Sequence, residues 1–481
     1  MNNSLLKKFI EFGMGNFIVL ITGFISSPII TRLVLPEELG KFSMFNTLTS
    51  LFLFIILCGL DHTYIRFFYE EKEESRGGLL IRAIKLPLLI NLVLSLILLA
   101  LYEPLSNLLI GNVSFMLIVV MVIHNTFNII NKFSMVVVRM QQKGKTYSFL
   151  QVLGRVSYIL FIVMSLSWFK NDYRILVFGT VVSNIVVSLI AVCIEKNYWF
   201  SFKKQGTLNT SMKEMLRFGI PLVFSFSIAW ILQSTDKIFI ESFNGYAELG
   251  VYTAAFTIVS LLNAVQESFV TFFTPVANEH YKQQPENTTF FSQINAIATV
   301  LMFFIGIGII VFKDVFVMLL GESYREASYI FPFLIFMPMM LTISETTVIG
   351  INFHKQTKKH IKISMIAAVI NVIGNFILVP RLGAKGAAIS TGISYVVLYI
   401  ARTYESKKLY EVQYHQASLF ISLFFLTILA IYASFNPVNL TLIGLGILTG
   451  IIVLFLYRKP IMEIIQGWRQ KSYRPVKGVM R

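Results

Sequence analysis

The chain has 481 residues, of which 56% are hydrophobic and only 14% are charged, and its formal net charge is +16. Apolar runs of about 20 residues, the length a helix needs to cross roughly 30 Å of hydrocarbon, recur from one end to the other. The connections between these runs are too short to bury a core of their own. The sequence therefore excludes a large folded domain outside the membrane.

We predict an all-α membrane protein of about 14 transmembrane helices. An even number of crossings places both termini on the same side of the membrane. In chain order, the predicted spans are residues 12–35, 42–66, 79–101, 113–135, 147–169, 173–194, 216–240, 250–275, 290–312, 327–350, 361–380, 383–401, 416–435 and 438–457.

The Lys and Arg residues are distributed very unevenly between the two sides of these spans. Residues near the end of a span are counted with the adjoining side. Of the 41, the side that holds the termini then carries 31, and Arg155 alone lies deep inside a span. The other side carries nine: Arg32, Lys41, Lys170, Arg174, Lys237, Lys313, Arg325, Arg381 and Lys385. Because short cytoplasmic loops are enriched in Lys and Arg, we expect both termini in the cytoplasm. Topology and attraction to anionic membrane lipids then explain the positive charge, without nucleic acid as a partner.

The sequence shows no signature of a cofactor or of catalysis. Cys58 and Cys193 both fall within predicted spans, which indicates neither a disulfide framework nor the ligand spacing of a metal site. The phosphate-binding motif G-x-x-x-x-G-K-[ST] is missing, so this chain does not itself use ATP as an energy source. We expect no enzyme activity, no catalytic residue, no cofactor and no metal.

Two segments of the chain repeat one another weakly but in the same order. Phe12-Gly13 in span 1 is followed by Glu38-Leu39-Gly40, and Phe218-Gly219 in span 7 is followed by Glu248-Leu249-Gly250. Spans 1 and 7 cross the membrane in the same direction, so the repeats are parallel. Two parallel six-helix lobes around a central cavity are typical of transporters.

The repeat also predicts the domain organisation. We expect an N-terminal six-helix lobe at residues 1–205, a C-terminal six-helix lobe at 206–410, two additional transmembrane helices at 411–457 and a basic cytoplasmic tail at 458–481.

Ionisable residues inside the predicted spans mark candidate functional positions, because a charge in hydrocarbon is costly. Arg155 in span 5 is the deepest basic residue, and Asp61, Glu267 and Glu345 lie at a similar depth or slightly nearer the cytoplasm. Three interpretations stay open. Arg155 binds an anion in the cavity, or it pairs with one of these carboxylates as a structural contact, or its side chain extends to the membrane interface.

Polar stripes run along two of the spans. Span 4 carries His124, Asn128 and Asn131 at i, i+4 and i+7, and span 11 carries Asn371 and Asn375 one turn apart. Such stripes serve either interhelical hydrogen bonding or substrate contact. Together with the three carboxylates, these residues are the candidates for intramembrane polar contacts or ion coupling.

Four segments resemble a known family. Residues 31–42, TRLVLPEELGKF, resemble its first exofacial turn, and residues 371–388, NVIGNFILVPRLGAKGAA, resemble its hairpin of spans 11 and 12. Residues 216–222 and 320–324 also look like family segments. The family is that of the bacterial polysaccharide flippases, which are the lipid-linked oligosaccharide exporters of the multidrug/oligosaccharidyl-lipid/polysaccharide superfamily. The resemblance covers essentially the whole chain.

This resemblance implies a function and a cargo. Such a protein flips a polyprenyl-pyrophosphate-linked oligosaccharide repeat unit from the inner to the outer leaflet of the bacterial cytoplasmic (inner) membrane. It works by alternating access, and it serves the biosynthesis of a cell-surface polysaccharide such as capsule, exopolysaccharide or O-antigen. Family members carry a cationic cavity, for which Arg32, Arg66 and Arg155 are the candidates here. The implied partners are the cargo, membrane lipids, a polysaccharide polymerase and its chain-length machinery, and the transport unit is expected to be a monomer.

Two alternative functions are open. A cation-coupled multidrug antiporter of the same superfamily typically uses a membrane-embedded acidic residue early in the chain, and span 1 has none after Glu11 at its boundary. A membrane polysaccharide polymerase would be expected to show a long exofacial loop, whereas the predicted loops are all short.

The predicted topology can be tested by cysteine labelling. Single cysteines introduced into the connections 102–112 and 436–438 should react with an impermeant thiol reagent in intact cells, because both connections are predicted to face outward. Cysteines introduced at residues 355–358 should react only after the membrane is permeabilised. The reverse pattern would refute the orientation.

Overall fold

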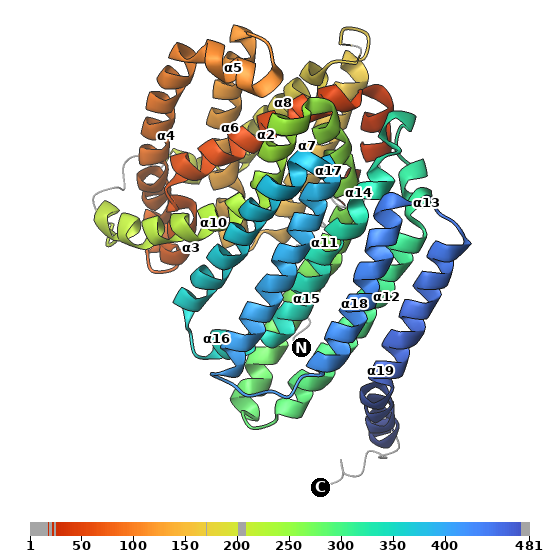
Figure 1. Cartoon of the computed structure of the whole chain (residues 1–481). Coiled ribbons are helices and arrows are strands. Elements are labelled where there is room, and N and C mark those ends of the chain that lie inside the picture. Colours follow the sequence, from red (N-terminus) through yellow and green to blue (C-terminus); the bar gives the residue numbers. More distant parts are fainter. Residues whose placement is uncertain (1–17, 19–21, 24–25, 170, 201–207, 473–481) are drawn as a thin grey trace. The chain divides into compact units, whose positions relative to one another are not determined.

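The computed structural model describes residues 18, 22, 23, 26–169, 171–200 and 208–472 (Figure 1). The regular elements in these residues are all helices. The first predicted span, residues 12–35, lies largely outside the described residues, and only residues 26–33 at its end are described as a continuous helical stretch.

The helices follow one another with short connections. The first ten are α2 (Pro36–Leu57), α3 (Leu60–Phe67), α4 (Arg76–Ala100), α5 (Tyr102–Ile110), α6 (Phe115–Met140), α7 (Gly144–Ser165), α8 (Tyr173–Ile194), α9 (Lys196–Trp199), α10 (Met212–Asn244) and α11 (Tyr246–Gln283). The others are α12 (Thr288–Val311), α13 (Lys313–Met318), α14 (Ala327–Leu334), α15 (Phe336–Thr347), α16 (Ile349–Phe353), α17 (Thr357–Lys407), α18 (Gln416–Phe435) and α19 (Leu440–Ser472). Two short 3-10 helices, η1 (Glu73–Ser75) and η3 (Glu322–Tyr324), complete the set.

Within the described residues, 12 helical segments are long and apolar enough to cross a membrane. They correspond to predicted spans 2–14, because spans 11 and 12 together form the single element α17. A helix satisfies all its backbone hydrogen bonds internally, which is why apolar sequence adopts this structure in lipid. The prediction of an all-α, multi-pass membrane protein is confirmed.

The element α17 is a hairpin rather than one long helix. At Gly383 the backbone takes φ 57° and ψ −137°, which interrupts the helical conformation. Across the turn, the Asn371 amide donates to Thr391 Oγ1 at 3.1 Å, and Ser390 Oγ donates to the Asn371 carbonyl at 2.9 Å. A Cβ on Gly386 would lie 2.4 Å from the Leu378 carbonyl oxygen, so the two arms meet closely at the turn. This is the hairpin expected for spans 11 and 12.

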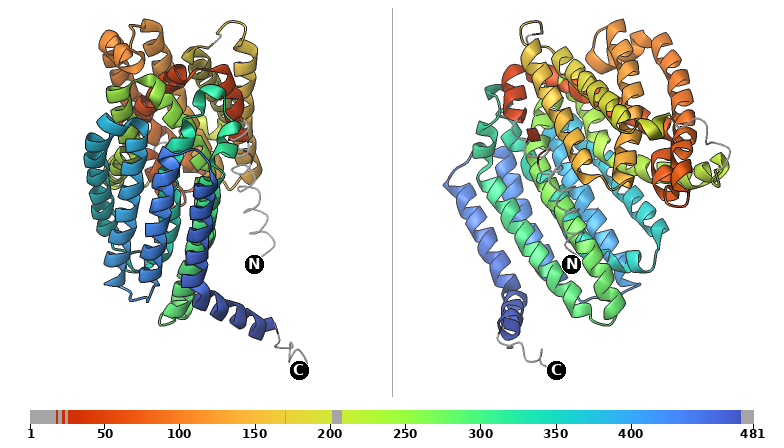
Figure 2. Two further views of the ribbon diagram at one scale, coloured as in Figure 1. Left: turned by 45° about the vertical axis from the view of Figure 1, so that its right-hand side comes forward. Right: turned by 180° about the vertical axis from the view of Figure 1, so that it is seen from behind.

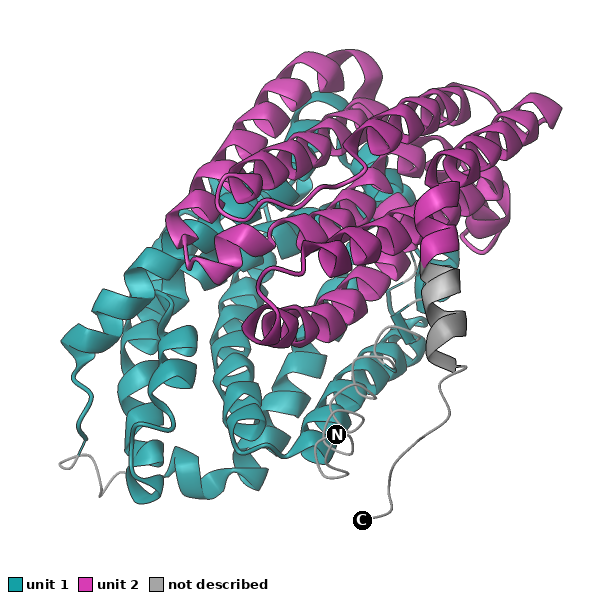
Figure 3. Cartoon of the chain, turned by 90° about the horizontal axis from the view of Figure 1, so that it is seen from below, with its two compact units in different colours: residues 1–253 teal, residues 254–481 magenta. Residues whose placement is uncertain are grey.

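The chain divides into two compact units, residues 1–253 and 254–481, which Figure 3 colours separately. The first unit includes all of α10, the predicted span 7, because α10 packs against α2 and α3. The Trp230 indole donates to Ser50 Oγ at 2.9 Å in this contact. The division into six-helix lobes at residues 205 and 206 stays a prediction.

Within unit 1, the two Glu-Leu-Gly repeats meet in a reciprocal crossing. A Cβ on Gly40 would lie 1.9 Å from the carbonyl oxygen of Tyr246, and a Cβ on Gly250 would lie 1.8 Å from that of Pro36. Thr253 Oγ1 donates to Ser43 Oγ at 2.9 Å beside them. Gly40 corresponds to Gly250, Pro36 to Tyr246 and Ser43 to Thr253, all at the same offset in residue number. The start of α2 and the start of α11 are therefore related locally by a pseudo-two-fold axis.

A second close contact interrupts the predicted span 2. Cys58 and Gly59, between α2 and α3, both have positive φ, 48° and 72°. A Cβ on Gly59 would lie 2.4 Å from the carbonyl oxygen of Gly219 on α10. The break in the helix therefore brings the backbones of α3 and α10 together, and it sets the direction in which α3 continues.

In unit 2, α18 lies beside α12 and α14, and α19 lies beside α12 (Figure 2). Lys313 attaches the end of α18, since its ammonium donates to the carbonyl oxygens of Ala433 at 2.5 Å and Asn436 at 2.7 Å. The last carbonyls of a helix lack intrahelical partners and carry partial negative charge, so a buried cation satisfies them well. The Tyr329 ring covers the same ammonium at 4.2 Å.

The crossing in unit 1 predicts a specific intolerance to added volume. Gly40→Ala or Gly250→Ala forces a backbone shift, and we expect each to lower the unfolding free energy by about 1–3 kcal/mol. Thermal unfolding of the detergent-purified protein measures the effect. Gly308→Ala is the matched control, because a Cβ at Gly308 of α12 meets nothing within 4 Å. Equal stability of Gly40→Ala and Gly308→Ala would contradict the close contact.

Candidate functional site

Arg155 lies on α7, in the middle of a predicted span, and is half-buried. Its Nη2 atom is 3.8 Å from the position that a Cβ on Gly23 would take, so the guanidinium lies close to Gly23 without crowding it. Within the described residues, no carboxylate forms an ion pair with it. A guanidinium placed in this way is available to bind an anion.

The other two candidate arginines are placed differently. Arg66 is exposed at the end of α3 and forms an ion pair with Glu70, one helical turn further on. Arg32 is exposed near the end of the helical stretch 26–33, just before α2. No contact between described residues joins Arg32, Arg66 and Arg155, so a shared cationic site made of all three stays a prediction.

Asp61 occupies the first turn of α3 and is only 4% exposed. Two basic side chains lie against its Oδ2 atom: Lys132 Nζ of α6 at 3.7 Å and His62 Nε2 at 3.6 Å. Both distances exceed those of hydrogen bonds, so these contacts are electrostatic. The first turn of a helix also favours a negative charge.

The basic side chains around Asp61 are accessible, in contrast to the carboxylate. The side chain of Lys132 is 46% exposed and that of His62 is 41% exposed, against 5% for Asp61. The imidazole of His62 stacks on Phe226 of α10, with ring centroids 4.6 Å apart. Arg139, two turns beyond Lys132 on α6, is exposed as well. We call Asp61, His62, Lys132 and Arg139 the α3–α6 charge cluster.

Part of the polar stripe of α6 makes contacts between helices, and part of it is accessible. His124 is buried and its Nδ1 atom lies 3.3 Å from the Asn184 amide of α8, while Asn131 donates to the same Asn184 at 2.9 Å. These contacts are interhelical hydrogen bonds. Asn128 is half-buried between them in sequence, and Lys132 lies one turn further on the same side of α6.

The stripe of α17 is internal to its hairpin. Asn371 and Asn375 are both fully buried, and the Asn375 amide donates to Asn371 Oδ1 at 3.1 Å. Since Asn371 in turn donates to Thr391, the chain of amides connects the two arms of the hairpin. Interhelical hydrogen bonding, one of the two interpretations left open by the sequence, is observed for this pair.

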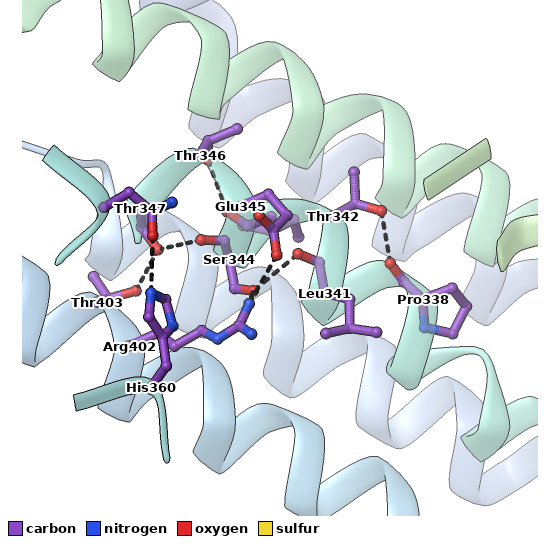
Figure 4. A network of polar contacts seen from close by, with 12 residues as sticks. Pro338, Leu341, Thr342, Ser344, Glu345, Thr346, Thr347, His360, Arg402 and Thr403 are labelled. Atoms are coloured by element: carbon purple, nitrogen blue, oxygen red, sulfur yellow. Dashed lines mark hydrogen bonds and ion pairs between the residues drawn. The ribbon is translucent and has the colours of Figure 1, made fainter. Parts of the chain in front are cut away.

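Glu345 lies in a network of polar contacts between α15 and the end of α17 (Figure 4). Arg402 Nη1 donates to Glu345 Oε1 at 2.9 Å and to Ser344 Oγ at 3.0 Å. Thr347 and Thr403 share a hydrogen bond of 2.7 Å beside them. Glu267 is exposed on α11, and its pairing with Arg155 stays a hypothesis.

Sequence reasoning missed the partners of these carboxylates. Lys132 was counted as a residue of the cytoplasmic side, although its spacing of four from Asn128 places it on the polar stripe. His62 directly follows Asp61 in the sequence, so the two residues do not have the helical spacing that would have indicated a contact. Arg402 is 57 positions from Glu345, and only the tertiary structure reveals such a pair.

Comparisons with known proteins agree with this architecture. A family model described as "Polysaccharide biosynthesis protein" matches residues 5–280. The chain is 24% identical to the capsular polysaccharide biosynthesis protein CapF of Staphylococcus aureus over 424 residues, covering 84% of this chain and all of that protein. It is 23% identical to the Lsg locus putative protein 1 of Haemophilus influenzae over 333 residues, covering 65% of this chain and 78% of that protein.

Solved structures show the same fold. The lipid II flippase MurJ in an inward closed conformation superposes with a TM-score of 0.71 and 16% identity, covering 94% of this chain and all of that one. An inward-facing multidrug resistance MATE family transporter of the MOP superfamily gives a TM-score of 0.59 and 16% identity, covering 82% of this chain and 94% of that one. The family model covers more than half of the sequence, and the chain therefore belongs to the polysaccharide biosynthesis protein family.

Proposed function

We propose that this protein flips a polyprenyl-pyrophosphate-linked oligosaccharide from the inner to the outer leaflet of the bacterial cytoplasmic membrane. The observation that carries the proposal is Arg155, a half-buried guanidinium in a predicted span that no described carboxylate neutralises. Family membership supports it, as does the relative whose name places it in capsular polysaccharide biosynthesis.

The chemistry of the cargo suits the residues of unit 1. A pyrophosphate requires cationic hydrogen-bond donors, and a guanidinium can hold two of its oxygens at once. Lys132, His62 and Arg139 of the α3–α6 charge cluster supply further basic groups at an accessible surface. The half-buried amide of Asn128 offers hydrogen bonds of the kind that a sugar requires.

The energy for this reaction comes from outside the chain, in the form of an ion gradient or the membrane potential, because the sequence contains no ATP-binding motif. We infer that both termini lie in the cytoplasm, that the transport unit is a monomer, and that a polymerase receives the flipped unit. The strong excess of Lys and Arg on the terminal side supports the orientation.

A cation-coupled multidrug antiporter is the second candidate, favoured by the similarity of the fold to the MATE family transporter. Its cargoes are cationic, so a negative binding surface would suit them. The α3–α6 charge cluster instead combines one buried carboxylate with three basic side chains. This balance of charge favours an anionic cargo.

Substitution of Arg155 tests the proposal in cells. Arg155→Ala should reach normal membrane abundance yet reduce polysaccharide export about tenfold to a hundredfold, since a hydrogen bond to a charged group contributes about 1.5–3 kcal/mol. Arg155→Lys should lose less, because it keeps the charge without the planar geometry. Arg174→Ala is the matched control, since Arg174 pairs with Asp172 at a helix start away from the site.

The structural interpretation of Arg155 makes a different prediction for the same experiment. If Arg155 is paired with Glu267 in the membrane, Arg155→Ala leaves the Glu267 carboxylate inside a span without its partner, which is costly in lipid, and the abundance of the protein falls. Arg155→Ala combined with Glu267→Ala should then recover both abundance and export. Normal export by a stable Arg155→Ala protein would remove Arg155 from the site.

Reconstitution tests the energy source. Purified protein in liposomes should move a lipid-linked oligosaccharide between leaflets without ATP, measured by the accessibility of the sugar to an enzyme added outside. Liposomes without protein, and liposomes with Arg155→Ala, are the controls. If transport by this chain alone strictly required ATP, the inference that the chain does not itself use ATP would be wrong.

A further inference from the structure

We propose that Asp61 is an internal competitor for the anionic cargo. Its carboxylate attracts Lys132 from the inner side of the α3–α6 charge cluster, lowers the affinity of the cluster for the pyrophosphate, and speeds the release of the cargo. The inference rests on the proposed function. It adds to that function a residue that does not touch the cargo and acts on it through the basic side chains in front of it.

Asp61 lies behind the basic side chains of the cluster. Its side chain is 5% exposed, whereas that of Lys132 is 46% exposed and that of His62 is 41% exposed. Both basic groups face the same atom of Asp61, Oδ2, which is 3.7 Å from Lys132 Nζ and 3.6 Å from His62 Nε2. An anion that enters from the accessible side therefore meets the basic groups first, and the carboxylate remains on their far side.

The backbone fixes the carboxylate in this buried position. Asp61 belongs to the first turn of α3, where the end of the helix favours a negative charge. Just before it, a Cβ on Gly59 would lie 2.4 Å from the carbonyl oxygen of Gly219, so the start of α3 is packed directly against α10. The long side chain of Lys132 can reach outward, whereas the short side chain of Asp61 stays where the helix places it.

The contacts of Asp61 differ from those of the other buried carboxylates. Four are buried among the described residues: Asp61, Glu71, Glu195 and Asp236. The last three accept short hydrogen bonds, from the Thr210 backbone at 2.8 Å, from Lys143 at 2.7 Å and from Tyr252 at 2.6 Å, respectively. Neither contact of Asp61 with a basic side chain is as short as a hydrogen bond. Another anion can therefore draw Lys132 away from Asp61 without breaking a hydrogen bond.

The direction of the effect on cargo follows from the arrangement of the charges. A pyrophosphate diester is negatively charged on both phosphates, and it binds the cluster through Lys132 on the accessible side. The carboxylate behind the ammonium repels the phosphates and competes for the same positive charge. Near a surface that water reaches, one such charge changes an affinity by about tenfold. Asp61 therefore shortens the time for which the cargo stays bound.

A positioning role of Asp61 has the opposite consequence. If the carboxylate served only to hold Lys132 and His62 in the geometry that binds cargo, its removal would weaken binding. The direction in which the affinity changes therefore distinguishes the two roles.

Calorimetric titration of the full-length protein in detergent measures the affinity, with a short-chain prenyl pyrophosphate monosaccharide as the probe. Asp61→Asn keeps the shape of the side chain and removes its charge, so it should bind the probe about tenfold more tightly at low salt. The difference from the natural protein should shrink at about 1 M salt, because ions screen the repulsion. In liposomes with saturating cargo, the same variant should transport about threefold to tenfold more slowly, since tighter binding acts mainly on dissociation.

Further variants assign the effect. Asp172→Asn is the matched control: it removes one negative charge at the start of α8, where asparagine can also cap the helix, and it should bind as the natural protein does. When Lys132→Gln is already present, Asp61→Asn should increase the affinity little, because the ammonium for which the carboxylate competes is missing. Asp61→Ser, which also lacks the charge, replaces Asp61→Asn if that variant does not accumulate in the membrane.

The outcomes separate this inference from the proposed function. If the natural protein does not bind the probe, both fail. If the natural protein binds it and Asp61→Asn binds equally or more weakly, the inference fails and the proposed function stands. Tighter binding with undiminished transport would also overturn the inference, because release would then not depend on Asp61. An equal increase in affinity in Asp172→Asn, or in the presence of Lys132→Gln, would overturn it as well.

Discussion

A polar side chain inside a membrane needs a partner, because lipid offers none, and this requirement decides the role of most polar residues in the spans. His124 and Asn131 share Asn184 across two helices, and Asn371 reaches Thr391 across a hairpin. Glu345 is neutralised by Arg402. These residues hold helices together.

The same requirement makes the accessible charges in unit 1 informative. Arg155 has no carboxylate beside it in the described structure, and Lys132 and His62 stand half-exposed over a single buried aspartate. Keeping such groups in a span is costly unless water or a ligand reaches them. We infer that the surface carrying them is wet and faces the path of the cargo.

The spans could be predicted because their signal is local: about 20 apolar residues in sequence are enough to indicate a crossing. The repeat was also visible, since Glu-Leu-Gly recurs at Gly40 and Gly250, and the structure explains why glycine stands there. Each glycine lets one backbone touch the other, and Ser43 and Thr253 meet at the same crossing. The break at Cys58 and Gly59 could not be predicted, because it depends on Gly219, which is distant in sequence.

The same difference between local and long-range contacts applies to the candidate site. The ion pair of Arg66 with Glu70 spans one helical turn and could be read from the sequence. The pairing of Asp61 with Lys132 joins residues 71 positions apart on two helices, and the sequence places Lys132 only at the cytoplasmic end of its predicted span. When the residues of a functional cluster come from separate helices, no pattern within any one segment distinguishes them.

A transporter must also release what it binds, and this limits how the positive charge of its site can be built. A site made only of fixed charges that held a pyrophosphate tightly would retain it on the far side of the membrane, since favourable entry must be matched by exit. Lys132 faces the buried Asp61 carboxylate at 3.7 Å, so an anion that binds this ammonium competes with an internal partner. That competition weakens the retention of the anion, which reconciles recognition of a highly charged group with its release.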